Sequence, residues 1–482
     1  MNTMVLSTII LLPLLAALIA ALVPSERLRP LLLPATALVH LTLVVKLALV
    51  PTPETIPGFL GLDALGRLIL LVVSLLFTAS SFYAVGYFRT HPTWSNRIFC
   101  VCLLVFLAAM SLAAAARHLG LLWVAVEATT VVSAPLIYFN RNRFSIEATW
   151  KYLLLCSVGI ALAMLGLLFI AYAGLHGGGE QGLELDRLLA TARNLSRPWL
   201  RTGFVFLLIG FGTKMGLAPL HTWKPDAYGE APGLVGGLLA GGLTSIAFLA
   251  VIRSMQIMNA AGEQMMARTF LLALGVLSLL FAAVFVIRQR DIKRMLAYSS
   301  VEHMGLLAIG LAMGRVAAYG AMFHVLNNAL TKGALFMSAG NIHRYFGSKR
   351  MCETQGAINV LPWSAGLFLA GFLAITGSPP FGPFMSEFTI LRGIFGTGHP
   401  YLGLTVIGLL TVIFIGMSGT VLTVALGPAM EEVEDPEACR ESFITIISPL
   451  VLMGLVLGLG IYLPEPLRQL FQEAADLMEA AP

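Results

Sequence analysis

Residues 212–232 read GTKMGLAPLHTWKPDAYGEAP, and the interpretation of the whole chain starts from this stretch. It begins in an apolar segment that carries a lysine, Lys214, and then meets Pro219, which removes a backbone N–H and disrupts a helix. His221 and Lys224 follow where an uninterrupted membrane helix would continue with apolar residues. Charged groups beside a broken helix are costly in a bilayer, and they usually line a polar cavity or an ion path.

The composition places this stretch in a membrane protein. The chain has 482 residues, of which 58% are hydrophobic and 11% charged, and its mean hydropathy is +0.86. Soluble proteins carry about 25% charged residues. The net charge of +5 comes from basic residues scattered over short loops, which argues against nucleic acid as a partner. The five cysteines show no CxxC spacing, so we expect no haem, iron–sulfur cluster or metal site in this chain.

The hydropathy pattern predicts an all-α polytopic membrane protein with about 14 transmembrane helices, since each span needs about 20 apolar residues. The expected spans are 4–23, 31–50, 66–88, 98–116, 119–138, 151–173, 202–228, 233–253, 268–287, 295–313, 317–341, 360–396, 402–427 and 443–463. The spans 202–228 and 360–396 are long because prolines break both. If both termini lie outside, the loops that face the cytoplasm contain more lysine and arginine than the outer loops. We therefore predict that both termini are outside.

The positions of the two broken spans predict an internal repeat. Spans four to eight and spans nine to thirteen form two groups of five, and the fourth span of each group is broken. Interrupted spans at matching places indicate two inverted repeats, as in transporters with midplane binding sites. The expected units are 1–97 with the first three helices, 98–255 and 256–428 with the repeats, and 429–482 with an acidic loop, the last helix and a short amphipathic tail.

Ionisable residues inside the expected spans are few, and each is expensive. An Asp, Lys or Arg at the bilayer centre costs about 2.5–3.5 kcal/mol, so such groups must be paired, hydrated or used. Those that we single out are Glu127, Lys214, His221, Glu302, His303, His324, Lys332 and Glu387. His324, Asn328 and Lys332 are spaced i, i+4, i+8, so they form one polar stripe on a helix. Glu302 and His303 are neighbours that face about 100° apart, so we expect at most one of them to share a narrow path.

Glu127 and Lys214 carry opposite charges within one group of five spans. At ~4 Å and an effective dielectric of ~20, the attraction between them would be about 4 kcal/mol. Separating the pair would favour release of the lysine proton, because a buried charge without a counter-charge is unstable. The pair is therefore interpreted as a switch, with a static buried salt bridge as the alternative.

Three motifs together resemble one known family. They are TKMGLAPLHTWKPDAYGEAP at 213–232, RQRDIKRMLAYSSVEHMG at 288–305 and GSPPFGPFMSEF at 377–388. Over roughly residues 60–430 the chain resembles the antiporter-like proton-translocating subunits of respiratory complex I, Mrp cation/proton antiporters and membrane-bound hydrogenases. The second and third motifs look most like component F of hydrogenase-4-type complexes.

The resemblance implies a half-channel in each repeat and a line of charged residues joining them at the membrane midplane. The residues that match the family's proton-translocating positions are Glu127, Lys214, His324, Lys332 and Glu387, and we add His221 to them. A second set of candidates consists of Glu302, His303, Ser245, Asn328 and Lys224. One departure stands out: the family's bridging lysine or histidine would fall near Ser245, where this chain has no ionisable group. Water held by Thr244 and Ser245, or His221, would have to bridge that gap.

The resemblance also implies partners and a location. We expect further antiporter-like membrane subunits, lipid, and a peripheral redox arm whose nickel–iron and iron–sulfur centres lie in partner subunits, since no cofactor is expected in this chain. The expected function is proton translocation in a hydrogenase-4 or formate-hydrogenlyase-type complex of a bacterial or archaeal cytoplasmic membrane, without redox catalysis by this chain. The alternatives are a complex I (NADH-quinone oxidoreductase) subunit, an Mrp-type sodium/proton antiporter subunit, and a structural scaffold that no longer pumps.

Overall fold

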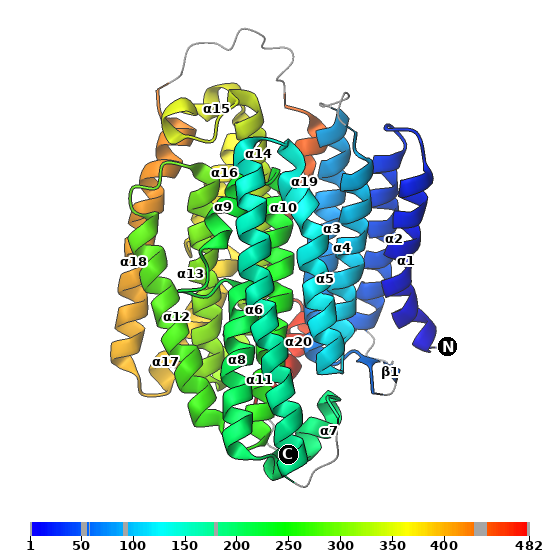
Figure 1. The fold of residues 1–482 in the computed structure, drawn as a ribbon. Coiled ribbons are helices and arrows are strands. Elements are labelled where there is room, and N and C mark those ends of the chain that lie inside the picture. Colours follow the sequence, from blue (N-terminus) through cyan, green and yellow to red (C-terminus); the bar gives the residue numbers. More distant parts are fainter. Residues whose placement is uncertain are drawn as a thin grey trace.

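The computed structural model describes residues 2–49, 55–56, 58–89, 95–177, 182–428 and 441–479, and these residues form a bundle of roughly parallel and antiparallel helices (Figure 1). The N-terminal part packs at one side of the bundle. Its second and third helices are joined by a small hairpin of two strands with two residues each. Its elements are α1 (Asn2–Leu22), η1 (Arg29–Leu31), α2 (Leu32–Leu49), β1 (Thr55–Ile56), β2 (Leu60–Gly61) and α3 (Ala64–Arg89).

The next group of helices contains the first broken span. Its elements are α4 (Arg97–Ala115), α5 (Leu119–Ile137), η2 (Tyr138–Asn140), α6 (Arg143–His176), α7 (Leu185–Ala190), η3 (Ala192–Asn194), α8 (Arg197–Met215), α9 (Trp223–Glu230), α10 (Gly233–Gly237), η4 (Leu238–Leu243) and α11 (Thr244–Ala260). The segment η4 is a π-helical turn, so α10, η4 and α11 form one continuous helix with a local widening.

The remaining helices contain the second broken span and the C-terminal segment. They are α12 (Gln264–Val286), α13 (Ile292–Met313), α14 (Arg315–Phe346), η5 (Met351–Glu353), α15 (Ala357–Val360), α16 (Pro362–Ile375), α17 (Gly382–Gly396), α18 (Pro400–Leu426), α19 (Phe443–Ile461) and α20 (Glu465–Asp476). The expected acidic loop at 428–442 lies almost wholly outside the described residues.

Helices occupy all of the segments that the sequence predicts as spans. In the described part of the chain, 11 helices are long and apolar enough to cross a membrane. The other expected spans coincide with α8 and α9, with α14, and with α16 and α17. The helices α16 and α17 have 14 and 15 residues, because the break divides one span into two short halves.

Both breaks occur where glycine ends a helix. Gly216 follows α8 with φ 80°, and Leu217 donates a backbone hydrogen bond of 2.9 Å to Gly212, which closes the last turn. Pro219 then prevents the helix from continuing, and the chain resumes as α9. Gly377 ends the second broken span in the same way, after α16 and with φ 70°. The chain resumes as α17 at Gly382, with Pro383 in its first turn.

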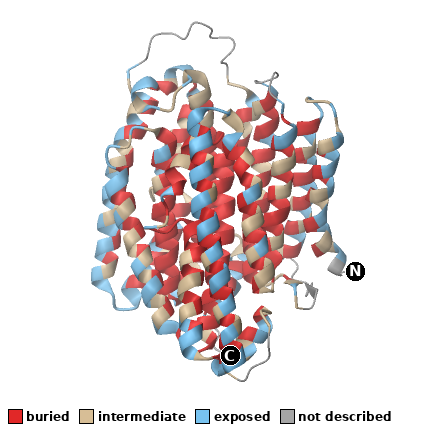
Figure 2. Cartoon of the chain, in the orientation of Figure 1, coloured by how far each residue is buried: buried red, intermediate tan, exposed pale blue. Residues whose placement is uncertain are grey.

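Burial separates an inner group of helices from an outer one (Figure 2). The helix from Gly233 to Ala260 is buried along the whole of its apolar window, whereas α18 and α6 expose large apolar side chains such as Leu404 and Leu154. An apolar outer surface around a core of buried polar groups suits a protein surrounded by lipid. The chain is therefore an integral membrane protein.

Buried polar contacts fix the outer helices on the core. The ring of His40 on α2 lies 2.9 Å from Ser74 on α3 and 3.0 Å from Ser111 on α4. Asp63, just before α3, binds Arg253 at 2.6 Å and Arg117 at 2.8 Å. Burial raises the pKa of the Asp63 carboxyl, but the two guanidinium groups lower it by more, so its pKa is held well below the usual range. Asp63 therefore stays ionised and binds two distant parts of the chain.

The two ends of the bundle differ. Both termini lie at the same end as α7, and α15 lies at the opposite end (Figure 1). The tail helix α20 buries Leu470 and Phe471 against the bundle, and Glu473 binds Arg67 at 2.7 Å. We refer to the two ends below as the α7 end and the α15 end.

Candidate functional site: a line of buried ionisable side chains

Glu127 and Lys214 form a hydrogen-bonded cluster with two hydroxyl groups. Lys214 on α8 is fully buried, and its Nζ donates to Thr130 at 2.6 Å and to Tyr152 at 2.9 Å. Thr130 in turn donates to Glu127, one turn earlier on α5, at 3.0 Å. Glu127 and Lys214 thus share Thr130, and no direct ion pair joins these two described residues. The direct contact assumed from the sequence is replaced by a hydroxyl relay.

Lys224 is buried between the two groups of helices and has no hydrogen-bond partner among the described residues. Its side chain packs on Gly216, where an added Cβ would lie 2.0 Å from the lysine Cε. Lys332 is the charged group that acts most strongly on the Lys224 ammonium, and the Lys224 Nζ lies 6.0 Å from the centre of the Tyr228 ring.

The polar stripe of α14 faces the interior. His324, Asn328 and Lys332 are all 0% exposed, as their i, i+4, i+8 spacing predicts for one helix face in the core. Lys332 donates to the carbonyl of Leu296 on α13 at 3.2 Å, and its charge interacts with that of Glu302. Neither polar atom of the Asn328 amide has a partner among the described residues. The stripe is thus buried and only partly hydrogen-bonded.

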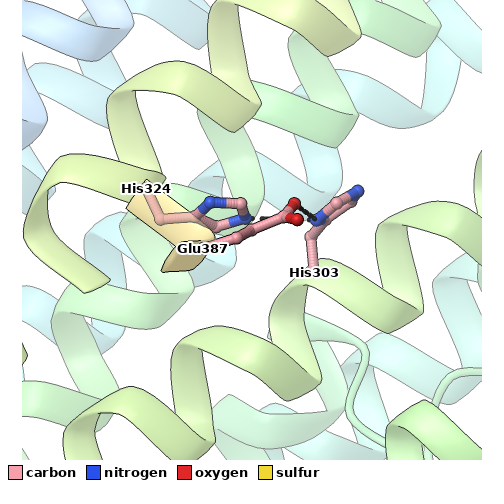
Figure 3. Close-up of side chains that lie close together, drawn as sticks. All are labelled: His303, His324 and Glu387. Carbon is pink, nitrogen blue, oxygen red and sulfur yellow. Dashed lines mark hydrogen bonds and ion pairs between the residues drawn. The ribbon is translucent and has the colours of Figure 1, made fainter. Parts of the chain in front are cut away.

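Two histidines and a carboxylate, His303, His324 and Glu387, meet in the second group of helices (Figure 3). The ring of His303 on α13 lies 3.1 Å from that of His324, and its Nδ1 lies 3.9 Å from Glu387 Oε1 on α17. The other ring nitrogen of His303 lies 3.9 Å from Glu302. Glu302 and His303 therefore contact each other, while the expectation that at most one of them shares a narrow path stays a prediction. The 100° between their Cβ directions is offset by the length of the glutamate side chain.

His303, His324 and Glu387 are the one set in the described part of the chain whose ligand atoms could hold a metal ion, since these atoms lie within 4.8 Å of one another. Ser386 supports the set, because its hydroxyl lies 2.9 Å from the second nitrogen of His324. The same arrangement can hold and pass protons, since each ring has two nitrogens that exchange donor and acceptor roles.

Two further candidates take different positions. His221, in the break before α9, is 3% exposed and packs edge-on against Phe281 and Tyr298. Ser245 and Thr244 are buried, and their hydroxyls donate to carbonyls of their own helix, to Gly241 at 2.5 Å and Ala240 at 2.6 Å. A hydroxyl that donates one hydrogen bond can still accept another. The ionisable group that could take the place of the bridging residue missing near Ser245 is Lys224, whose ammonium is influenced by the charge of Lys332.

Sequence reasoning missed the hydroxyl and thiol members of the line. Thr130, Tyr152 and Cys156 connect the first cluster, and Ser386 orients His324. Thr130 follows Glu127 by one helical turn, and Ser386 precedes Glu387 directly, so spacing gives a weak signal for these two. Tyr152 and Cys156 lie on α6 and face the lysines only through tertiary packing.

Comparisons with known proteins identify the family of this chain. A model of the family described as NADH:quinone oxidoreductase/Mrp antiporter, TM, matches residues 116–415. The chain is 33% identical over 373 residues to the hydrogenase-4 component F homolog of Methylacidiphilum infernorum, which covers 77% of each chain. It is 33% identical over 341 residues to NADH-quinone oxidoreductase subunit N of Desulforudis audaxviator, covering 70% of this chain and 67% of the relative.

A solved structure shares the whole fold. A chain of the membrane-bound sulfane sulfur reductase, an archaeal respiratory membrane complex, superposes with a TM-score of 0.88 at 22% identity, covering 98% of this chain and 97% of the other. The extent of the family match shows that this chain belongs to the NADH:quinone oxidoreductase/Mrp antiporter family of membrane subunits.

Proposed function

We propose that this chain is a proton-translocating membrane subunit of a redox-driven complex, and that the line of buried side chains is its proton path. The observation that carries the proposal is a set of buried ionisable groups that extends over both groups of helices. It comprises the hydrogen-bonded cluster of Glu127, Thr130 and Lys214, the buried Lys224 and Lys332, and the cluster of His303, His324 and Glu387. A bilayer core tolerates so many ionisable groups only where they line a functional path.

The energies involved suit this role. Moving one elementary charge against ~150 mV costs about 3.5 kcal/mol. An opposite-charge contact near 4 Å contributes about the same at an effective dielectric of ~20. His303 and Glu387 lie at such a distance, 3.9 Å, and they form an opposite-charge contact when the imidazole is protonated and the carboxyl group is ionised. A redox-driven change that makes or breaks one contact of this kind therefore suffices to load or release one proton.

The arrangement favours two connected halves. The first cluster lies among α5, α6 and α8, and the second among α13, α14 and α17. We propose that each group of helices provides one half-channel, as the two broken spans at matching places suggest. Lys224, close to the break in α8, then passes protons between the halves in place of the bridging group absent near Ser245.

We further propose a hydrogenase-4-type complex in a cytoplasmic membrane as the assembly, with both termini outside. The similarity to a hydrogenase-4 component F homolog supports this choice. In this proposal the nickel–iron and iron–sulfur centres belong to a peripheral arm made of partner subunits. A tagged complex that co-purifies with nickel and a hydrogenase large subunit would support the assignment. Flavin with a nicotinamide-oxidising module, or only small membrane subunits, would assign the chain to complex I or to an Mrp antiporter instead.

The proton path is tested by replacing Lys214 with alanine. In inverted membrane vesicles of the intact complex, we expect Lys214→Ala to lower redox-driven proton uptake at least tenfold while redox turnover continues, since Thr130 and Tyr152 lose the ammonium group that they share. Lys151→Ala is the control, because Lys151 is partly exposed and pairs with Glu147 and Asp226. Normal proton uptake in Lys214→Ala would contradict the proposed path.

A further inference from the structure

Two adjoining cavities on the side of the bundle lie apart from the proton path. The first is an apolar groove of about 570 Å³ between α2 and α19, with α3 as its floor. Its lining residues are Leu31, Pro34, Leu41, Leu75, Thr78, Ala79, Phe82, Val85, Phe443, Ile444, Ile447, Ser448, Val451, Leu452 and Leu455. At Gly86, where an added Cβ would lie 2.7 Å from Thr445, α3 approaches α19 closely and closes the bottom of the groove.

The groove extends over half of a membrane. On α19 its lining runs from Phe443 to Leu455, which is about 18 Å at ~1.5 Å per residue. The hydrocarbon core of a bilayer is about 30 Å thick, so the groove spans about one leaflet. A spanning helix of a partner subunit would contact a groove of the full thickness, whereas the acyl chains of one lipid occupy one leaflet.

The second cavity, of about 780 Å³, continues the groove at the α15 end, and the two share Leu31 and Val85 in their linings. Its polar side chains include Glu26, Arg27 and Arg89. Glu26 is neutralised by Arg29, whose Nη1 lies 2.7 Å from its carboxylate, and it also accepts from the Asn96 backbone. Arg27 and Arg89 are exposed and have no ion pair among the described residues, so the cavity holds uncompensated positive charge.

We infer that the two cavities together bind one anionic phospholipid. Its phosphate contacts Arg27 and Arg89, and its acyl chains lie in the groove between α2 and α19. The charge selects an anionic headgroup, and each basic side chain near the surface contributes affinity for it. The depth of the groove fits the acyl chains of a single leaflet.

The inference is tested by lipid titration of the delipidated native complex, followed by native mass spectrometry of the phospholipid bound to this chain. We expect dioleoylphosphatidylglycerol to bind more tightly than dioleoylphosphatidylcholine. Replacing both Arg27 and Arg89 with glutamine should weaken phosphatidylglycerol binding by on the order of 30-fold and leave phosphatidylcholine binding unchanged, from ~1 kcal/mol for each basic residue. Arg288→Gln, which removes another exposed arginine at the α15 end, should change neither.

A second variant tests the groove itself. Ala79→Phe fills part of the floor on α3, so binding of both lipids should fall together. Equal binding of the two lipids by the native complex would overturn the inference, as would unchanged phosphatidylglycerol binding after loss of both arginines. Capture of a membrane polypeptide, and no lipid, by a photo-crosslinking residue at position 41 would also overturn it. Redox-driven proton uptake is measured separately, so these outcomes are independent of the proposed function.

Discussion

Lys224 is a buried lysine whose Nζ has no hydrogen-bond partner among the described residues, which points to a functional role. A buried ammonium group without a hydrogen-bond partner carries a desolvation cost, and the Tyr228 ring 6.0 Å from its Nζ offsets only a small part of it. The groups that face it are Lys332 from α14, Cys156 from α6 and Tyr228 from its own helix, while His221 lies one turn earlier in the chain. None of these is a carboxylate that would hold it as a static ion pair. The position therefore suits a lysine that gains and loses a proton during turnover.

The role of Lys224 is tested by two replacements that separate charge from proton exchange. Arginine keeps a positive charge but does not release its proton, and methionine keeps the approximate volume without charge. We expect Lys224→Arg and Lys224→Met both to lower redox-driven proton uptake at least tenfold in vesicles where redox turnover continues. Lys151→Arg is the matched control on an exposed lysine. Proton uptake at the parent rate in Lys224→Arg would mean that the residue supplies only a positive charge.

At the scale of elements, the break after α8 returns the side chain of Lys224 to the end of that helix. A continuous helix would carry Lys224 along the axis of α8, roughly 15 Å beyond Lys214 at ~1.5 Å per residue. Because the helix ends at Met215 and restarts at Trp223, the side chain of Lys224 instead folds back over Gly216. The broken span therefore brings a second charged group back to the end of α8, next to Gly216.

Gly216→Ala tests this packing against a neighbouring glycine. An alanine at φ 80° is strained by about 1–2 kcal/mol, and its Cβ would overlap the Lys224 side chain, which adds about 1–3 kcal/mol. We expect a lower melting temperature of the purified complex and reduced proton uptake. Gly212→Ala is the control, since its Cβ would find its nearest neighbour, a Leu217 methyl, at 3.6 Å inside α8. Similar melting temperatures for the two variants would show that Lys224 does not depend on this contact.

Over the whole molecule, the two groups of helices meet around α14. Its His324, Asn328 and Lys332 face α13 and α17, and at its far end Asn341 accepts a 2.8 Å hydrogen bond from Tyr83 on α3. Asp63 adds a second long-range link through Arg253 on α11. The proposed proton path is thus held by contacts between segments that are far apart in the sequence.

The orientation in the membrane is a prediction for the whole molecule. Both termini lie at the α7 end, which we expect outside, so Cys352 near α15 should face the cytoplasm. In a Cys439→Ser background, a membrane-impermeant maleimide should label Cys352 in inverted vesicles and not in right-side-out vesicles. Asn194 is exposed near α7, and Asn194→Cys is introduced into a background that also lacks Cys352. This cysteine should be labelled in right-side-out vesicles and not in inverted vesicles. Labelling of Cys352 from the outside would reverse the proposed orientation.

The sequence by itself determined the parts of this protein that depend on hydropathy and local stereochemistry. The membrane helices, the breaks at Pro219 and Pro379, and the identity of the buried charges follow from these alone. A bilayer penalises polar groups, and proline close to a glycine ends a helix, although single prolines lie inside α1, α5 and α19. The stripe of α14 could be predicted for the same reason, since a 3.6-residue period fixes which side chains share a face.

Only the tertiary structure decided how the charges connect. Thr130 between Glu127 and Lys214, and Lys224 beside Lys332, depend on the packing of helices that are distant in sequence. Glu302 and His303 meet because a flexible side chain can offset the angle between neighbouring Cβ directions. Hydroxyls and thiols carry little cost in a bilayer and leave no hydropathy signal, so their place in the line appears only when the helices are packed together.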